Sequence, residues 1–220
     1  VHSAKDLPGE LEKGLVLGAV LEREDARDAF VSFSHDSVAA VPEGGKVGTG
    51  SLRRRMQLLL QNDRLTVVPI RGNVETRIKK LKTEGLDGIV LAFAGIKRLG
   101  LEKYVRQIIP VNVMTPACGQ GAIGIEVRDE RVFTKFIAAV NDERSFREVS
   151  IERDLLARIG GGCHMPVGIH SAITGNTVKL YVSVGDSENK ALLHNLYAGN
   201  IKDTDALVAK VFLKIKNVMK

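Results

Sequence analysis

Seven arginines fall in one stretch of the chain and could bind anionic groups. Residues 51–100 hold 11 basic and 4 acidic side chains, although the formal net charge of all 220 residues is only +6. A guanidinium presents a planar fork that matches the two oxygens of a carboxylate or phosphate. A solvated basic face and a nucleic-acid patch are the alternatives, but the stretch holds one aromatic residue, Phe93, for base stacking. The arginines are Arg53, Arg54, Arg55, Arg64, Arg71, Arg77 and Arg98.

Strands and helices alternate through this stretch, and the alternation explains where the arginines lie. Short apolar strands are expected at 46–49, 65–70 and 88–93, with helices that begin at Ser51 and Asn73. This order predicts an α/β sheet that is largely parallel. We expect Leu52, Met56, Leu59 and Leu60 to form the apolar face of the first helix. The apolar face of the second helix is expected to be Val74, Ile78 and Leu81.

Ligands of open α/β sheets bind beyond the carboxyl ends of the strands, near helix N-termini. Most of the arginines follow such strand ends, where backbone N–H groups already favour an anion. The sequence therefore favours a polyanionic ligand over a solvated face. Arg55 and Arg64 lack this placement and are expected to face water. The side chains at the strand ends are Thr49, Ser51, Arg53, Arg54, Arg71, Arg77 and Arg98.

Two further positions could carry covalent or acid–base chemistry. Cys163 lies in IGGGCHMPVG, where three glycines leave the sulfur accessible and basic neighbours could lower its pKa. A nucleophile and a small core residue are equally favoured there, while Cys118 is expected to be structural. Zinc is not expected, because no second Cys/His pair has ligand spacing. Asp6 in VHSAKDLP is favoured as a turn carboxylate, although its polar neighbours keep catalysis open.

The second half of the chain has a different pattern. We expect a strand at 122–127, helices at 132–140 and 143–159, and three strands within 168–199. A C-terminal helix with an apolar face follows. This order predicts a small α+β domain that begins near residue 140.

Composition excludes several classes of protein. The chain is 44% hydrophobic and 26% charged, as in ordinary globular proteins, and no apolar run approaches the ~20 residues of a membrane span. Two cysteines exclude a disulfide framework and suggest a reducing compartment. We therefore expect a cytoplasmic protein. Because the chain starts at Val1, we also expect its beginning to be missing.

Seven blocks of the sequence together resemble the porphobilinogen deaminase (hydroxymethylbilane synthase) family. They are VHSAKDLP, EREDARDAF, VGTGSLRRR, IRGNVETR, LAFAGIKRLGL, PACGQGAIGIE and GGGCHMPVG, and they cover nearly all of residues 1–170. The resemblance implies a transferase of tetrapyrrole (porphyrin and heme) biosynthesis. Such an enzyme joins four porphobilinogens head to tail, releases ammonia each time and frees hydroxymethylbilane. It needs no metal, and the resemblance suggests a monomer without nucleic-acid or membrane partners.

The resemblance also implies roles for individual residues. Cys163 matches the cysteine that binds a dipyrromethane cofactor as a thioether, and Asp6 matches the catalytic aspartate. Cofactor contacts are implied for Ser3, Lys5, Thr49, Ser51, Arg53 and Arg54. Substrate contacts are implied for Arg71, Arg77, Arg98 and Gln120. The runner-up is a non-catalytic α/β module that binds organic polyanions, in which Cys163 is inert.

On the family's template the chain divides into parts of three domains. Residues 1–21 and 120–138 are expected to form an incomplete first domain, and residues 22–119 the second, anion-binding domain. Both are expected to resemble periplasmic binding proteins. Residues 140–220 are expected to form the third, cofactor-attachment domain. We expect this chain alone to show little or no turnover.

Overall fold

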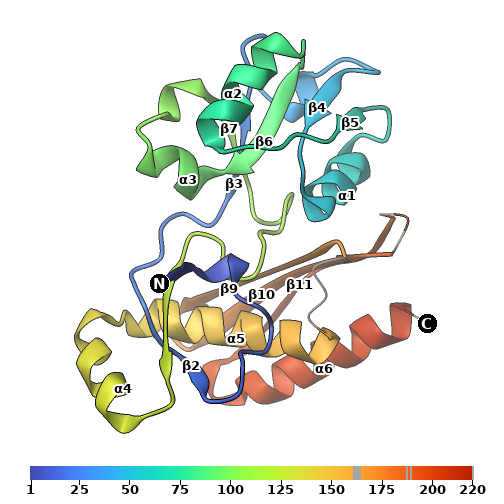
Figure 1. Ribbon diagram of the computed structural model, residues 1–220. Coiled ribbons are helices and arrows are strands. Elements are labelled where there is room, and N and C mark those ends of the chain that lie inside the picture. The colour runs from blue at the N-terminus through green and yellow to red at the C-terminus, as the bar shows by residue number, and fades with distance from the viewer. Residues whose placement is uncertain (161–164, 187, 189, 220) are drawn as a thin grey trace.

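The computed structural model describes residues 1–160, 165–186, 188 and 190–219, and it contains three β-sheets with helices packed on them (Figure 1). Cys163 lies outside the described residues, so the structure does not test the role expected for it. Among the described residues, no helix is long and apolar enough to cross a membrane. The expected class, an α/β sheet followed by a smaller α+β unit, is confirmed.

The largest sheet has five strands and is mixed. Its order is β5 (Thr66–Val68), β4 (Lys46–Gly48), β6 (Gly88–Ala92), β3 (Asp28–Val31) and β7 (Val105–Ile109). β4 runs parallel to β5 and β6, whereas β3 runs antiparallel to β6 and β7. The expectation of a largely parallel sheet is therefore only partly met. The residue pattern of a strand reports its burial, not the direction of its neighbour.

Three helices follow strands of this sheet: α1 (Leu52–Gln61), α2 (Val74–Thr83) and α3 (Phe93–Arg98). The Ser51 hydroxyl accepts from the Arg54 N–H, and the Asn73 side chain accepts from the Thr76 N–H at 2.8 Å. Both predicted helix starts are thus capped. Ile78 and Leu81 of α2 are buried, as predicted.

The buried face of α1 differs from the predicted one. Leu52 and Leu60 are 42% and 51% exposed, while Arg53, Arg54 and Gln57 are buried. The reason lies in polar partners from elsewhere in the fold. Gln57 donates to the Thr115 carbonyl at 3.1 Å and accepts from the Thr115 N–H at 2.6 Å. Helical spacing alone cannot foresee a polar surface opposite the helix.

A second sheet joins the two ends of the first half of the chain. Its order is β1 (His2–Ser3), β8 (Ile123–Arg128) and β2 (Leu15–Val20), and both pairs are antiparallel. Helix α4 (Arg131–Ile137) packs on β2 and β8. Residues 21–27 and 110–122 connect this sheet with the five-stranded one, and we call them the connecting segments.

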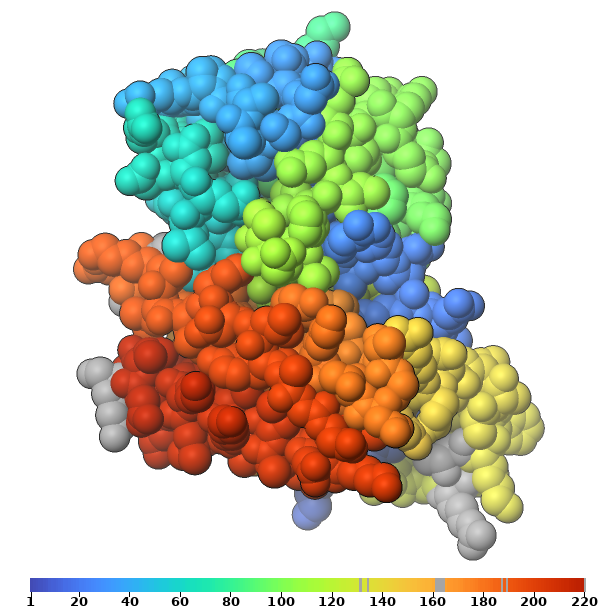
Figure 2. All heavy atoms as spheres, turned by 180° about the vertical axis from the view of Figure 1, so that it is seen from behind, coloured from blue at the N-terminus to red at the C-terminus, as the bar shows by residue number. Residues whose placement is uncertain are grey.

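The third sheet is an antiparallel meander of β9 (Val167–Thr174), β10 (Thr177–Gly185) and β11 (Ala191–Asn200). Helices α5 (Glu143–Ile159) and α6 (Thr204–Val218) cover one face and bury Leu155 and Val208 against Leu180. On another side, α1 contacts β10 and β11, as the view from behind shows (Figure 2). The predicted helices and strands of this half are confirmed.

One buried carboxylate ties the connecting segments to the third sheet. Glu152 of α5 accepts from both terminal nitrogens of Arg23, at 2.7 and 3.1 Å. It also accepts from the backbone N–H groups of Gly119 and Ser171, each at 2.7 Å. Because these groups come from both connecting segments and from β9, Glu152 fixes how the three sheets meet.

Candidate functional site

Arg53 and Arg54 share one buried counter-ion. Arg53 Nη1 lies 2.8 Å from Asp28 Oδ2, and Arg54 Nη2 lies 2.8 Å from Asp28 Oδ1. Burial alone would raise the pKa of Asp28, but the charges and hydrogen bonds of the two arginines outweigh it and lower the pKa to about 2. Asp28 is therefore a carboxylate at any physiological pH, and the cluster carries one net positive charge.

Gln120 completes this cluster from a connecting segment. Its amide nitrogen donates to Asp28 Oδ1 at 2.8 Å and to the Ala26 carbonyl at 2.7 Å. Its oxygen accepts from Arg53 and Arg54, each at 3.4 Å. Gln120 is fully buried, and most N–H groups of the two guanidiniums already have protein partners. The two guanidiniums are therefore held largely by partners within the protein.

A cleft of about 280 Å³ opens beside this cluster. Its lining comes from the turn after β1, the start of α1, a connecting segment, α5 and the start of β9. The lining includes cationic and apolar side chains but no carboxylate among the described residues. Leu156 and Met165, which line it, stand on either side of residues 161–164. Its lining is Lys5, Leu7, Pro8, Gly9, Gly50, Ser51, Leu52, Arg53, Ala117, Cys118, Leu156, Met165 and Val167.

Lys5 reports the electrostatic character of this cleft. The residue as a whole is exposed, but protein atoms around its ammonium group displace part of the solvent. This loss of solvent and the positive charge of Arg54 lower the pKa of Lys5, and they outweigh the opposing effects of Asp6 and Asp28. A cation is therefore disfavoured at this place. Loss of solvent disfavours a charge of either sign, whereas the positive charges of Arg54 and Arg53 favour an anion in the cleft.

The remaining residues predicted at the start of the chain lie close to Lys5 in sequence. Asp6 is exposed and ends the short helix Ala4–Asp6, while Ser3 in β1 is half-buried. Thr49 is buried, and its hydroxyl accepts from the Ser51 N–H at 3.2 Å. The Ser51 hydroxyl serves as the cap of α1.

The other arginines occupy different environments. Arg77 is half-buried and donates to the Gly72 carbonyl at 2.7 Å, and burial together with the charge of Arg54 lowers its pKa. Arg98 donates to the Gly121 carbonyl of a connecting segment at 3.1 Å, and Arg71 is exposed. Arg55 and Arg64 lie on the surface, as predicted.

Cys118 lines the cleft but is 8% exposed. Burial and the negative charge of Glu152 raise the pKa of its thiol, so it is a poor nucleophile. This agrees with the structural role predicted for it. The described residues contain no group of three or more His, Cys, Asp or Glu side chains that could hold a metal ion.

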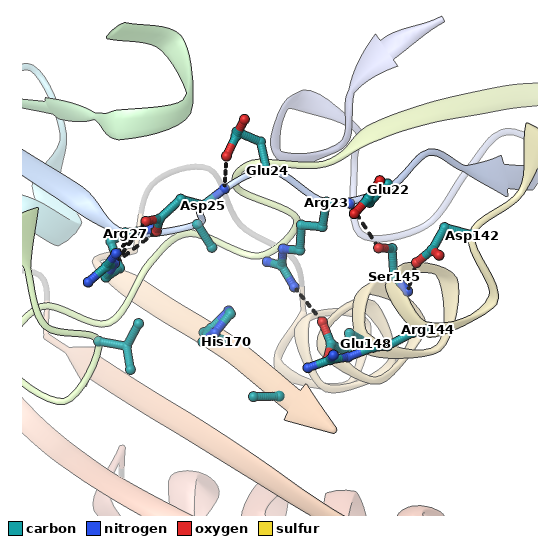
Figure 3. A pocket seen from close by; sticks show the side chains of 13 residues that line it. Glu22, Arg23, Glu24, Asp25, Arg27, Asp142, Arg144, Ser145, Glu148 and His170 are labelled. Atoms are coloured by element: carbon teal, nitrogen blue, oxygen red, sulfur yellow. Dashed lines mark hydrogen bonds and ion pairs between the residues drawn. The ribbon is translucent and has the colours of Figure 1, made fainter. Parts of the chain in front are cut away.

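A second hollow, of about 510 Å³, lies between residues 22–27, α5 and β9 (Figure 3). Arg23 points into it toward Glu148, at 3.9 Å, and His170 of β9 lies nearby.

The sequence did not indicate three of the charged residues described above, which are Asp28, Arg23 and Glu152. A charged residue beside the apolar run AFV was the available signal for Asp28.

Acid should weaken the fold through its two buried carboxylates. The pKa of Glu152 is lowered to about 2, because Arg23 and His170 outweigh the opposing effect of burial. The folded-state pKa values of Glu152 and Asp28 lie below the ordinary ones, so their stabilisation is complete above about pH 5 and is lost as pH falls toward 2. We expect each to contribute about 2–3 kcal/mol to the free energy of unfolding. Urea titrations between pH 7 and 3 measure this, and a constant free energy would contradict it.

Comparison with known proteins identifies related chains. Residues 1–135 match the family model "Porphobilinogen deaminase, dipyromethane cofactor binding domain", and residues 146–217 match "Porphobilinogen deaminase, C-terminal domain". Porphobilinogen deaminase from Campylobacter lari is 46% identical over 84% of this chain and 61% of its own length. The one from Alkaliphilus metalliredigens is 39% identical over 94% of this chain and 66% of its own length. The chain thus spans less than two thirds of these relatives.

A solved structure shows a weaker similarity. A lipoprotein of the YaeC family from Enterococcus faecalis aligns with 60% of this chain and 64% of its own, at 14% identity and a TM-score of 0.41.

Proposed function

Because the chain belongs to the porphobilinogen deaminase family, we propose that its cleft serves a hydroxymethylbilane synthase, which joins four porphobilinogens head to tail with release of ammonia. The observation that carries this proposal is the cationic cleft beside the Arg53–Arg54–Asp28 cluster, with Lys5 held at a lowered pKa. Each pyrrole of the substrate bears two carboxylates, so a growing chain is a polyanion. The electrostatic free energy of binding such a ligand is most favourable where positive charge is left uncompensated.

The residues of the cleft fit a dipyrromethane cofactor. Its carboxylates suit Lys5, the Ser51 hydroxyl and Arg53, while Leu7, Leu156 and other apolar side chains suit the faces of its pyrrole rings. The lining offers no carboxylate among the described residues that would repel it. When bound, the cofactor supplies the pyrrole carbon on which the product chain is extended. We propose Cys163 as its attachment point, since residues on either side of 161–164 line the cleft.

The side chains of this protein then have separate tasks. Asp6 is exposed in its turn, and we propose that its carboxylate stabilises the cationic pyrrole that forms as ammonia leaves. Arg53 and Arg54 set the positive potential while Asp28 and Gln120 hold them in place. We propose that Arg71, Arg77 and Arg98 receive carboxylates of substrate, and that Gln120, being buried, contributes by holding the arginine pair.

The mass of the purified full-length gene product tests the attachment. We expect a covalent increment equal to a dipyrromethane, absent from Cys163→Ala and kept in Cys118→Ala, because the Cys118 thiol is buried and protonated. Intact-protein mass spectrometry measures all three. An unmodified protein without turnover would favour the alternative, a non-catalytic module that binds organic polyanions.

Two further expectations complete the proposal. We propose that the protein acts in the cytoplasm, as its two cysteines suggest, and that it is a monomer, as the family resemblance implies. Light scattering during gel filtration tests the monomer, and a mass of two chains or more would contradict it.

A further inference from the structure

Arg153 of α5 is a buried cation whose environment differs from that of the other arginines on its helix. Arg144, Arg147 and Arg158 each pair with an acidic side chain four residues away on α5. Arg153 is 9% exposed and pairs with no carboxylate among the described residues. Burial of a charge without a counter-ion costs free energy, so packing alone does not favour arginine here.

The contacts of Arg153 are with the turn that carries Asp6. Its Nη2 donates to the backbone carbonyls of Pro8 at 2.9 Å and Gly9 at 3.2 Å. Its Nη1 is buried and has no hydrogen-bond partner among the described residues. A charged donor on two carbonyls forms stronger hydrogen bonds than a neutral donor does. Arg153 therefore fixes the chain just after Asp6.

The other end of this turn is fixed by a connecting segment. The Ala4 N–H donates to the Ala122 carbonyl at 3.0 Å. Gly119 has a positive φ of 69° and approaches Ala4 so closely that a side chain there would lie 2.8 Å from the Ala4 carbonyl carbon. Lys5 and Asp6 thus lie between two anchors, one on each side.

The helix that holds this turn also leads to Cys163. α5 continues from Arg153 to Ile159, where Gly160 caps it in the left-handed conformation. Six residues of helix span about 9 Å. On the way, Leu156 lines the cleft. A single rigid element therefore sets both the Asp6 turn and the start of the segment that contains Cys163.

We propose that Arg153 is a positioning residue, which holds the Asp6 turn at a fixed place relative to α5, the helix that precedes Cys163 in the chain. This inference rests on the proposed function for its catalytic consequence, but the anchoring itself does not. A carboxylate that stabilises developing charge acts only from a defined position, so loosening the turn lowers kcat and leaves substrate affinity intact.

The test uses the full-length gene product with Arg153→Met, which keeps the apolar stem, and Arg153→Lys, which keeps the charge but loses the fork. Arg147→Met is the matched control, because Arg147 is exposed on the same helix and pairs with Glu143. We expect hydrogen exchange of peptides covering residues 2–12 to become about tenfold faster in Arg153→Met. We also expect kcat to fall about tenfold with KM within about twofold. In both the exchange rate and kcat, Arg153→Lys should lie between the parent protein and Arg153→Met. Arg147→Met should match the parent protein in both.

Several outcomes would overturn the proposal. They are an unchanged kcat in Arg153→Met, a lower kcat without faster exchange at residues 2–12, or a raised KM alone. If Arg153→Met does not fold, the same comparisons apply to Arg153→Lys. A parent protein without any turnover would overturn the proposed function instead, and the exchange experiment would still decide whether Arg153 anchors the turn.

Discussion

Asp6→Ala in the full-length gene product is expected to lower kcat by about a hundredfold to a thousandfold, the usual cost of removing a fixed group that stabilises developing charge. Asp6 is exposed between Lys5 and Leu7, which line the cleft, and the charged side chains of the described lining are all cationic. No described side chain of the lining can therefore replace the negative charge of Asp6. Steady-state kinetics with porphobilinogen measures the effect. Intact mass should show the covalent increment retained, because Asp6 is not its attachment point.

A nearby acidic residue provides the control. Glu10 is exposed four residues after Asp6, and Glu10→Ala should leave both turnover and mass unchanged. Turnover retained in Asp6→Ala would show that another carboxylate carries the reaction. Loss of the mass increment together with turnover would place Asp6 in cofactor assembly.

Asp28→Asn should lower the free energy of unfolding by about 3–5 kcal/mol, because it leaves two buried arginines without their counter-ion. Asparagine keeps the size of the side chain but not its charge, so the effect reports electrostatics and not a cavity. We also expect a smaller fraction of this variant to carry the mass increment of a dipyrromethane, since Arg53 lines the proposed cofactor cleft. Urea denaturation followed by circular dichroism measures the stability.

Asp25→Asn is the matched control for this experiment. Asp25 lies three residues earlier and pairs with Arg27, whose side chain is 43% exposed. Exposed ion pairs contribute little, so this variant should lose less than about 1 kcal/mol. Equal losses in the two variants would show that the buried cluster has no special role.

Much of the local structure could be predicted from the sequence. The Asn73 cap, the apolar positions Ile78 and Leu81, and the strands of the C-terminal meander all followed from patterns within about ten residues. Helix caps and side-chain periodicity are local properties, and their physical causes lie in neighbouring residues. The family blocks likewise indicated which residues belong to the candidate site.

The face of α1 and the state of its arginines could not be predicted this way. Leu52 is exposed and Arg53 buried because Asp28, from a strand 25 residues earlier, supplies a counter-ion. Gln120 reaches the same carboxylate from 92 residues away. Burial of a charge depends on the partner it meets, and helical spacing carries no information about that partner.

The sequence by itself determined the secondary structure, the family and the residue types available for binding an acidic ligand. Only the tertiary structure decided which of these charges are compensated. Asp28 compensates part of the charge of the Arg53–Arg54 pair, loss of solvent and Arg54 lower the pKa of Lys5, and Arg153 is tied to the turn that carries Asp6. The physical reason is that electrostatic free energy depends on distance and burial between residues far apart in the chain, and folding alone sets both.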